Sequence, residues 1–286
     1  MNKKKTSYAW MIPVYAILIF WALTTIYPLG WVMMNSFKVK NEIIANSFAL
    51  PTGELFTLAN YKRAFDRVPI FGAYVNSLIV SGTVTFVVMA LAGMASFALV
   101  RYQFRGSSFL MSVVVASMMF PAFSTIVPVF RMEASWGVVN SSNRWMSLFS
   151  CALPQVAGNL SFAIIVLSGY IRSLPLELEE AAFMEGCSAL QIFGKIIIPL
   201  AKPSFATVAI FSFLWSYNDL FTQTFFLRLP KQWAITRLLK ELTAMEGTNY
   251  GLMAAAVTIV IVPVIVVYAC LQKYIIKGLT AGAIKG

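Results

Sequence analysis

The side chains with the most scope for chemistry gather in two short segments of an otherwise apolar chain. The first segment places an acid, Asp219, inside an apolar run beside amides, a hydroxyl and aromatic rings. Amides and hydroxyls bind solute hydroxyl groups, aromatic rings stack on apolar faces, and an ionisable residue within a membrane indicates a function. We therefore predict a solute path here, with contacts between helices as the alternative. The candidate residues are Trp215, Tyr217, Asn218, Asp219, Thr222 and Gln223.

The second segment, residues 172–202, is rich in acids and is too long for a simple turn. We predict a short helix whose glutamates lie near the positive end of its dipole, followed by a glycine stop and a second short helix over residues 189–195. A short helix lying along a membrane face can dock in the groove of a partner. The predicted boundary residues are Ser173 and Pro175 at the start, Met184 and Gly186 at the stop, Ser188 as the second cap, and Pro199 opening the next apolar run.

Neither segment indicates catalysis. The chain contains no histidine, which removes a histidine base, a Ser-His-Asp triad and imidazole metal ligands. Cys151, Cys187 and Cys270 lie far apart without CxxC spacing, so they predict neither a disulfide framework nor zinc. The only Gly-Lys pair that approaches a phosphate-binding loop, Gly194-Lys195, lacks the earlier glycine and the following Ser or Thr. We expect no enzyme, no cofactor and no metal, with energy supplied by a separate subunit.

The composition indicates the class of protein in which these two segments lie. Of 286 residues, 59% are apolar and 12% are charged, against about 45–50% and about 25% in soluble domains. This excludes a disordered chain, a fibre and an ordinary soluble enzyme, and predicts an all-α polytopic membrane protein of one domain. Each membrane-spanning helix needs about 20 apolar residues. Six runs qualify as transmembrane helices: residues 10–34, 76–100, 108–130, 146–171, 199–227 and 251–271.

Two of these runs contain helix-breaking residues. Pro121 and Pro128 lie in the third run, and Pro154, Gly158 and Asn159 in the fourth. Because a broken helix inside lipid must turn its freed carbonyls toward protein or a wet cavity, such breaks indicate a transport path. An ordinary packing kink is the alternative.

The charges orient the chain only in part. The net charge is +11, but the cations are scattered between apolar runs, which indicates lipid headgroups and not nucleic acid as their partner. Lysine and arginine divide equally between the two sides that six spans create. Lys3–Lys5 beside the first run, and Arg101 with Arg105 in a short loop, favour cytoplasmic N- and C-termini.

The acid-rich segment resembles the EAA loop of ABC importer permeases, E-A-A-x3-G-x9-I-x-L-P. Glu180-Ala181-Ala182, Gly186 and Ile196-Ile197-Ile198-Pro199 have this spacing, while Glu185, Cys187 and Ile198 replace the usual Asp, Ala and Leu. The resemblance implies a type I importer permease in a bacterial-type cell membrane. It also implies that residues 172–202 form a cytoplasmic coupling loop, which docks on an ATPase through Glu180, Ala181, Ala182, Gly186 and Pro199.

Further segments are similar to the carbohydrate, maltose-type branch of that family. They are Asn35-Ser36-Phe37-Lys38, Asn60-Tyr61, Asn76-Ser77, Met119-Phe120-Pro121, Trp215-Ser216-Tyr217-Asn218-Asp219, and a tail from Gln272 to Gly286. The resemblance implies a sugar or oligosaccharide importer that works by alternating access. Its expected partners are a second, homologous permease subunit in a heterodimer, two cytoplasmic ATP-binding subunits, and an extracytoplasmic solute-binding protein that residues 228–250 contact.

Two other functions stay open. One is an ABC permease for another small solute, such as a glycerol phosphate or a peptide, since the EAA loop alone does not exclude it. The other is an ion-coupled secondary carrier with Asp219 as its ion site. The sequence does not identify the solute.

Overall fold

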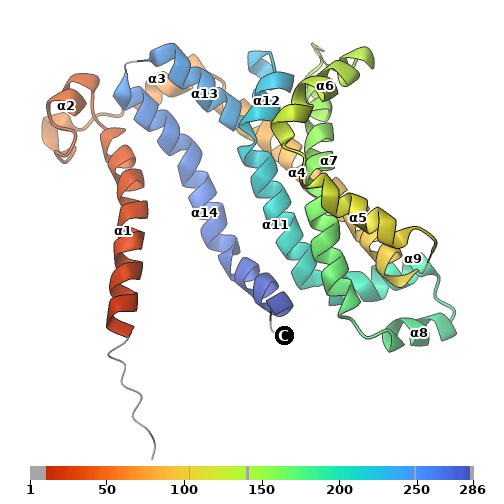
Figure 1. Cartoon of the computed structure of the whole chain (residues 1–286). Coiled ribbons are helices and arrows are strands. Elements are labelled where there is room, and N and C mark those ends of the chain that lie inside the picture. Colours follow the sequence, from red (N-terminus) through yellow and green to blue (C-terminus); the bar gives the residue numbers. More distant parts are fainter. Residues whose placement is uncertain (1–10, 103, 140–141, 248, 284–286) are drawn as a thin grey trace, which may run out of the picture. The chain divides into compact units, whose positions relative to one another are not determined.

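The structure is a computed structural model that describes residues 11–102, 104–139, 142–247 and 249–283, and all regular elements in these ranges are helices (Figure 1). Lys3–Lys5 and the last three residues of the tail, 284–286, lie outside the described residues. The chain divides into two compact units: residues 1–68 with 239–262, and residues 69–238 with 263–286.

The first unit joins the amino-terminal helices to the start of the last one. It contains α1 (Met11–Asn35), α2 (Lys40–Ala45), η2 (Gly53–Leu55), α3 (Ala59–Arg67), most of α13 (Ile235–Glu246) and the start of α14 (Tyr250–Ala283). The side-chain amide of Asn60 donates to the carbonyls of Ser36 and Lys38 at 2.9 and 2.8 Å, and the Tyr61 and Ser36 hydroxyls lie 2.7 Å apart. Two of the motifs that carried the family resemblance therefore bind each other.

Lys38 is fully buried in this unit. Its Nζ lies 3.4 and 3.3 Å from the carbonyl oxygens of Asn46 and Ser47. Burial lowers the pKa of the Lys38 ammonium, because desolvation disfavours the charged form, and the nearby Glu42 carboxylate partly opposes the shift. The lysine thus ties the turn after α2 to the end of α1.

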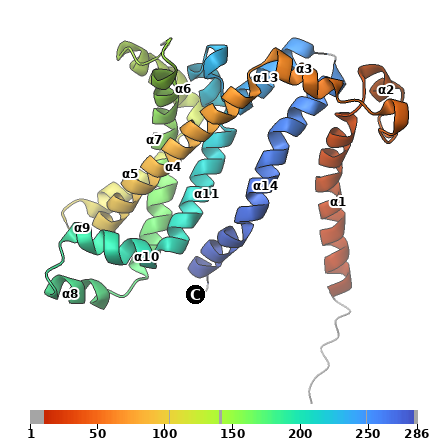
Figure 2. The same ribbon diagram turned by 180° about the vertical axis from the view of Figure 1, so that it is seen from behind.

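The second unit is a bundle built on three packed helices. α4 (Ile70–Arg101), α7 (Arg144–Arg172) and α11 (Lys202–Asn218) run side by side in Figures 1 and 2 and pack on one another. α5 (Ser107–Ser117), α6 (Ala122–Ser135) and α12 (Leu220–Phe226) pack against α7. α8 (Glu177–Met184) and α9 (Ala189–Ile192) lie at one end of the three helices, and α6 and α12 at the other.

Helices cover each of the six predicted runs. By length and composition, α1, α4 and α7 qualify alone to cross a membrane, and residues 189–200 with α11 qualify as a pair bent by 82°. The start of α14 and α5 are shorter apolar helices. The chain is therefore an all-α polytopic membrane protein, as predicted, while the count of six spans and the single domain stay predictions.

The predicted breaks are right for the third run and wrong for the fourth. α5 ends at Ser117 and α6 begins after Pro121, whereas Pro128 lies inside α6. α7 runs without interruption through Pro154. A break that was not predicted falls in the fifth run at Asp219, which separates α11 from α12. A proline costs one hydrogen bond and some bending, and packing along the full length of α4 compensates for that in α7.

Gly93 on α4 contacts two aromatic rings, Phe193 of η3 (Phe193–Ile197) and Phe205 of α11. A Cβ built at Gly93 would lie 2.9 Å from the ring of Phe205 and 3.1 Å from that of Phe193. The Phe193 ring also packs on Phe97, with ring centroids 5.5 Å apart. Only a residue without a side chain lets α4 approach these rings so closely.

We predict that Gly93→Ala destabilises the protein, because overfilling a packed contact costs about 1–3 kcal/mol. Gly82→Ala on the same helix is the control, since no described atom lies within 4 Å of a Cβ built there. The measurement is the apparent Tm of the detergent-solubilised protein. Equal Tm values for the two variants would contradict the close contact at Gly93.

Candidate coupling surface and solute cavity

The acid-rich segment folds into a short helix with a left-handed stop. α8 ends in paired bonds from the N–H of Cys187 to the Ala182 carbonyl, at 3.0 Å, and from the N–H of Gly186 to the Phe183 carbonyl, at 2.9 Å. This is the Schellman arrangement, and Gly186 has the φ of +83° that it requires. The predicted stop at Met184 and Gly186 is confirmed.

The predicted start of that helix is wrong. Ser173 does not cap α8, which begins after Leu176; its hydroxyl donates instead to the Tyr170 carbonyl at the end of α7, at 2.7 Å. The apolar run of α7 continues to Arg172, so Ser173 is taken up by the turn that ends it. The second cap is correct, because Ser188 and Gln191 form a reciprocal capping box at the start of α9.

The chain then continues as one bent rod. After α9 come the π-helical turn η3 (Phe193–Ile197) and α10 (Ile198–Leu200), and the rod bends by 82° at Ala201 before α11. Pro199 lies in α10, before the bend, and α11 begins after it with Lys202 and Pro203; the predicted start of the fifth span at Pro199 stays a prediction. A π-helical turn beside such a bend is typical of functional segments.

The surface of the coupling loop combines acids with large apolar side chains. Glu180 and Ala181 are exposed, and Ala182 is half-buried. Phe183, Met184 and Leu190 are 71%, 84% and 73% exposed. The prediction named the small residues and missed these three, although large apolar residues in an acidic segment were a visible signal. A cluster of exposed apolar side chains rimmed by charge marks a protein contact.

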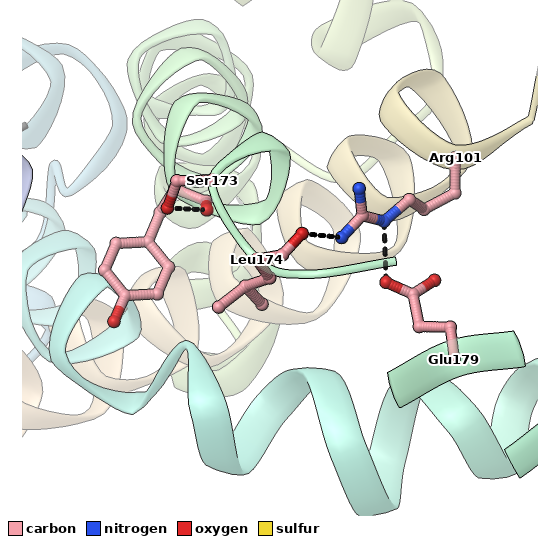
Figure 3. A network of polar contacts seen from close by, with 5 residues as sticks. Arg101, Ser173, Leu174 and Glu179 are labelled. Atoms are coloured by element: carbon pink, nitrogen blue, oxygen red, sulfur yellow. Dashed lines mark hydrogen bonds and ion pairs between the residues drawn. The ribbon is translucent and has the colours of Figure 1, made fainter. Parts of the chain in front are cut away.

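An ion pair holds this surface to the bundle. The Nε of Arg101, the last residue of α4, donates to the Glu179 carboxylate at 2.6 Å, and its guanidinium also donates to the Leu174 carbonyl at 3.0 Å. Figure 3 shows the Arg101 guanidinium between the two partners. Both charged side chains are about nine-tenths buried. In the sequence, Arg101 indicates only the orientation of the chain in the membrane, and no pattern pairs it with Glu179.

A cavity of about 600 Å³ lies in the same unit, between α5, α6, α7, α11 and α12. Of the residues proposed as signs of a path, Pro154 and Gly158 of α7 line the cavity, whereas Pro121, Pro128 and Asn159 are not among its lining residues. Met118 and Phe120, in the turn between α5 and α6, also line it. The walls combine aromatic rings with hydroxyl groups, namely those of Phe120, Trp136, Phe162, Trp215, Ser117, Thr125, Ser161 and Thr222.

The predicted path residues divide into three pairs. Trp215 and Thr222 line the cavity. Tyr217 and Gln223 are buried elsewhere, and the Gln223 amide donates to the carbonyls of Ser216 and Tyr217 at 3.1 and 3.4 Å. The other two residues serve the helix break.

Those two residues are Asn218 and Asp219. The Asn218 amide donates to the Leu214 carbonyl of its own helix at 2.8 Å. The Asp219 carboxylate accepts the N–H of Thr222 at 3.0 Å and so caps α12. The spacing from Asp219 to Thr222 is a capping signal that was available in the sequence.

Glu133 is a cavity residue that sequence reasoning missed. The third run was ended at residue 130, but α6 continues to Ser135 and buries Glu133 against the cavity. Its carboxylate accepts the Ser150 hydroxyl of α7 at 2.7 Å. Thr125, Val129 and Glu133 recur at the four-residue spacing of one helix face, so the helical period was the signal for it.

Residues 89–281 match the family described as the inner membrane component of binding-protein-dependent transport systems. The chain belongs to this family. The predicted importer permease is therefore confirmed at the level of family. The matched range includes the coupling loop and the cavity.

Relatives extend the similarity over nearly the whole permease. The diacetylchitobiose uptake system permease protein NgcG of Streptomyces coelicolor is 31% identical over 273 residues, which cover 95% of this chain and 88% of the relative. The trehalose transport system permease protein SugB of Mycobacterium tuberculosis is 29% identical over 276 residues, or 93% and 97% of the two chains.

A solved structure supports the fold of the permease. It is the crystal structure of a bacterial ABC transporter involved in the import of the acidic polysaccharide alginate. One of its chains aligns with a TM-score of 0.77 at 24% identity, covering 96% of this chain and 99% of that chain.

We predict that Gly186→Val opens the coupling loop of this permease. A side chain at φ +83° costs about 1–2 kcal/mol, whereas no described atom within 4 Å of the added Cβ would clash with it. Limited trypsin digestion of the detergent-solubilised protein should then cleave at Lys195 about 5- to 30-fold faster. Gly186→Asn is the control, because asparagine tolerates the left-handed region and should cleave much more slowly than the valine variant. Equal rates for wild type and the valine variant would contradict the constraint.

Proposed function

We propose that this chain is one permease subunit of an ATP-driven importer for a sugar or oligosaccharide. The observation that carries the proposal is the pairing of two features in one helical unit: a cavity lined by rings and hydroxyls, and a coupling loop fixed to the same helices through Arg101 and Glu179. The family accounts for transport, and these features account for the solute class and the energy source.

The walls of the cavity suit a carbohydrate. Sugars present hydroxyl groups around their edges and apolar C–H faces, and they bind where hydroxyl side chains and aromatic rings alternate. Trp215 on α11 and Thr222 on α12 offer one of each, and Glu133 offers a strong acceptor across the cavity. The printed names of two relatives, which assign them to diacetylchitobiose uptake and trehalose transport, support the same solute class.

The coupling loop suits an ATPase partner. Glu180 would pair with a basic residue of an ATP-binding subunit, the exposed Phe183 and Met184 would enter its groove, and Gly186 would keep the helix short. Two such subunits would bind this chain and a second, homologous permease. With the coupling loop on the cytoplasmic face, both termini are cytoplasmic.

The opposite end of the bundle would then face the outside. There a solute-binding protein would deliver the solute, through residues 228–250. A solved alginate transporter in complex with a pentasaccharide-bound periplasmic protein has a chain with a TM-score of 0.65 to this one at 16% identity, and it supports such a fold.

Uptake in whole cells tests the energy source. We expect cells with this chain and its partner genes to accumulate a labelled disaccharide from a panel that includes trehalose and diacetylchitobiose. Accumulation should stop when ATP is depleted by arsenate and should persist with a protonophore, because the driving reaction is hydrolysis and not an ion gradient. The reverse pattern would favour the ion-coupled carrier, and uptake of a peptide or glycerol phosphate alone would favour another ABC solute.

Trp215→Ala tests the cavity. Losing one ring stacked on a sugar face costs about 1 kcal/mol, so we expect the KM for uptake to rise about fivefold with the protein level in the membrane unchanged. Asn218→Ala is the control, because Asn218 is exposed at the end of the same helix, is not among the residues that line the cavity, and binds the Leu214 carbonyl of its own helix. A normal KM for Trp215→Ala, or equal effects of the two variants, would remove Trp215 from the path.

A further inference from the structure

A polar cluster centred on Asn76 occupies the end of α4 that lies away from the coupling loop. The amide nitrogen of Asn76 donates to the carbonyls of Lys231 and Trp233 at 3.2 and 2.9 Å. Its Oδ1 accepts the Nε of Arg144, the first residue of α7, at 2.7 Å. Asn76 is 1% exposed, the bond to Trp233 is buried, and the bonds with Lys231 and Arg144 are part-buried. Breaking any of them leaves a buried polar group without its partner, which is the costly case.

The next residue of α4 adds a third bond to the same segment. The hydroxyl of Ser77 accepts the N–H of Ile235 at 2.8 Å. These three bonds join residues 231–235 to α4 through backbone groups of the segment. We call residues 228–235 the clamped segment.

The clamped segment is itself rigid and presents side chains outward. It contains the turn η4 (Pro230–Gln232), and the Trp233 indole donates to the Arg228 carbonyl at 3.4 Å. Trp233 is buried, whereas Lys231 and Leu229 are exposed. Because the backbone bonds face α4, the exposed side chains are held in a fixed orientation for a partner.

Near each end of α4, an arginine bond links this helix to α7 or to the residues that follow α7. At one end Arg144 of α7 binds Asn76 of α4; at the other, Arg101 of α4 binds the Leu174 carbonyl that follows α7. Between Asn76 and Arg101 the helix is unbroken and spans about 37 Å at a rise of about 1.5 Å per residue, more than the thickness of a hydrocarbon core. α4 packs along α7 over this length, and Ser96 donates to the Ile164 carbonyl between them at 3.1 Å.

We propose that Asn76 is a positioning residue that couples the clamped segment to the coupling loop through the α4–α7 pair. On the proposed function, on which this inference rests, a solute-binding protein contacts the clamped segment. A shift of that segment moves α4 and α7 together because Asn76 and Arg144 join them. At the far end of the same pair, Arg101 of α4 binds Glu179 of α8 and the carbonyl of Leu174, two residues after α7, so the coupling loop moves with them.

The test uses the full complex of this chain, its partner permease, its ATP-binding subunits and its binding protein in lipid nanodiscs. The measured quantity is the ATPase rate with and without the sugar-loaded binding protein. In Asn76→Ala we expect the stimulation by the binding protein to fall about fivefold or more, a typical size for coupling between sites, and the basal rate to stay as in wild type. Thr85→Val on the same helix is the matched control, since the Thr85 hydroxyl bonds within α4 to Ser81.

Two further variants keep the test decisive if Asn76→Ala assembles poorly. Asn76→Asp keeps the acceptor for Arg144 and removes the two donors to the clamped segment. Arg144→Gln removes the link to α7 and keeps those donors. Each should lose stimulation with an unchanged basal rate, and the double variant should lose no more than the larger single loss, because the residues act in series.

Three results would overturn the inference. Wild-type stimulation in Asn76→Ala and Asn76→Asp would show that the clamp is not used. An equal fall of basal and stimulated rates would show a purely structural role. Partial losses in Asn76→Asp and Arg144→Gln that add in the double variant would separate Asn76 from Arg144. A wild-type complex that the binding protein does not stimulate would refute the proposed function, and the inference would fall with it.

Discussion

The pairing of Arg101 with Glu179 fixes the position of everything at its end of the bundle. A guanidinium and a carboxylate that are nine-tenths buried stabilise each other only if their geometry is good and their remaining groups are bonded. Arg101 meets this condition by binding Glu179 and the Leu174 carbonyl at once. Two constraints thus act on the seven residues from Ser173 to Glu179, which leaves α8 little freedom to tilt. Glu180, the next residue, is thereby held outward.

The bond between Arg101 and Glu179 explains why the glutamates of α8 differ in exposure. Glu179 is buried and bonded, whereas Glu177 and Glu180 are exposed. All three lie in the first turn, where the helix dipole favours negative charge, so the dipole alone does not distinguish them. Arg101 of α4 distinguishes them, because it bonds Glu179. A charged side chain that faces the bundle anchors the loop, and those that face away are free to meet another protein.

The packing of aromatic rings continues the same connection along α4. Phe193 lies on Gly93 and Phe97, about two turns and one turn before Arg101, and Phe205 reaches the same glycine from beyond the bend at Ala201. Both arms of the 82° bend are therefore seated on one helix. The bend needs such support, because a sharp change of direction near a membrane face loses the packing that a straight helix would provide.

The sequence predicted features that depend on a few neighbouring residues, and it failed where a distant partner decides. Gly186 and Ser188 end and begin their helices through bonds to residues within five positions, and their patterns were sufficient. Ser173 matched the pattern of a helix cap equally well, but α7 continues to Arg172, and the Ser173 hydroxyl bonds the Tyr170 carbonyl at its end. Arg101 and Asn76 act on residues about 80 and 155 positions away, and no local pattern contains that information. Pro154 was expected to break α7 because its cost is local, while its compensation by packing on α4 is not.

The polar residues of the fifth run show that the chemistry of side chains alone does not locate a binding site. The break at Asp219 takes the carbonyls of Ser216 and Tyr217 out of the regular helical bonding, with Ser216 accepting the N–H of Asp219 at 3.3 Å, and within a membrane such groups need partners in the protein. Gln223 donates to both, and Thr236 of α13 donates to Tyr217 at 2.8 Å. Asp219 in turn caps the helix that resumes.

Asp219 and Gln223 are thus occupied by the break itself, which removes the main reason to assign them to a solute or an ion. Trp215 and Thr222 are seven residues apart, two helical turns, and they face the cavity on either side of the break. Both also have structural contacts, because Trp215 packs on the rings of Phe162 and Phe211 and the Thr222 N–H bonds Asp219. The side chains of this run therefore serve the fold first, and only those that also reach the cavity are available for binding.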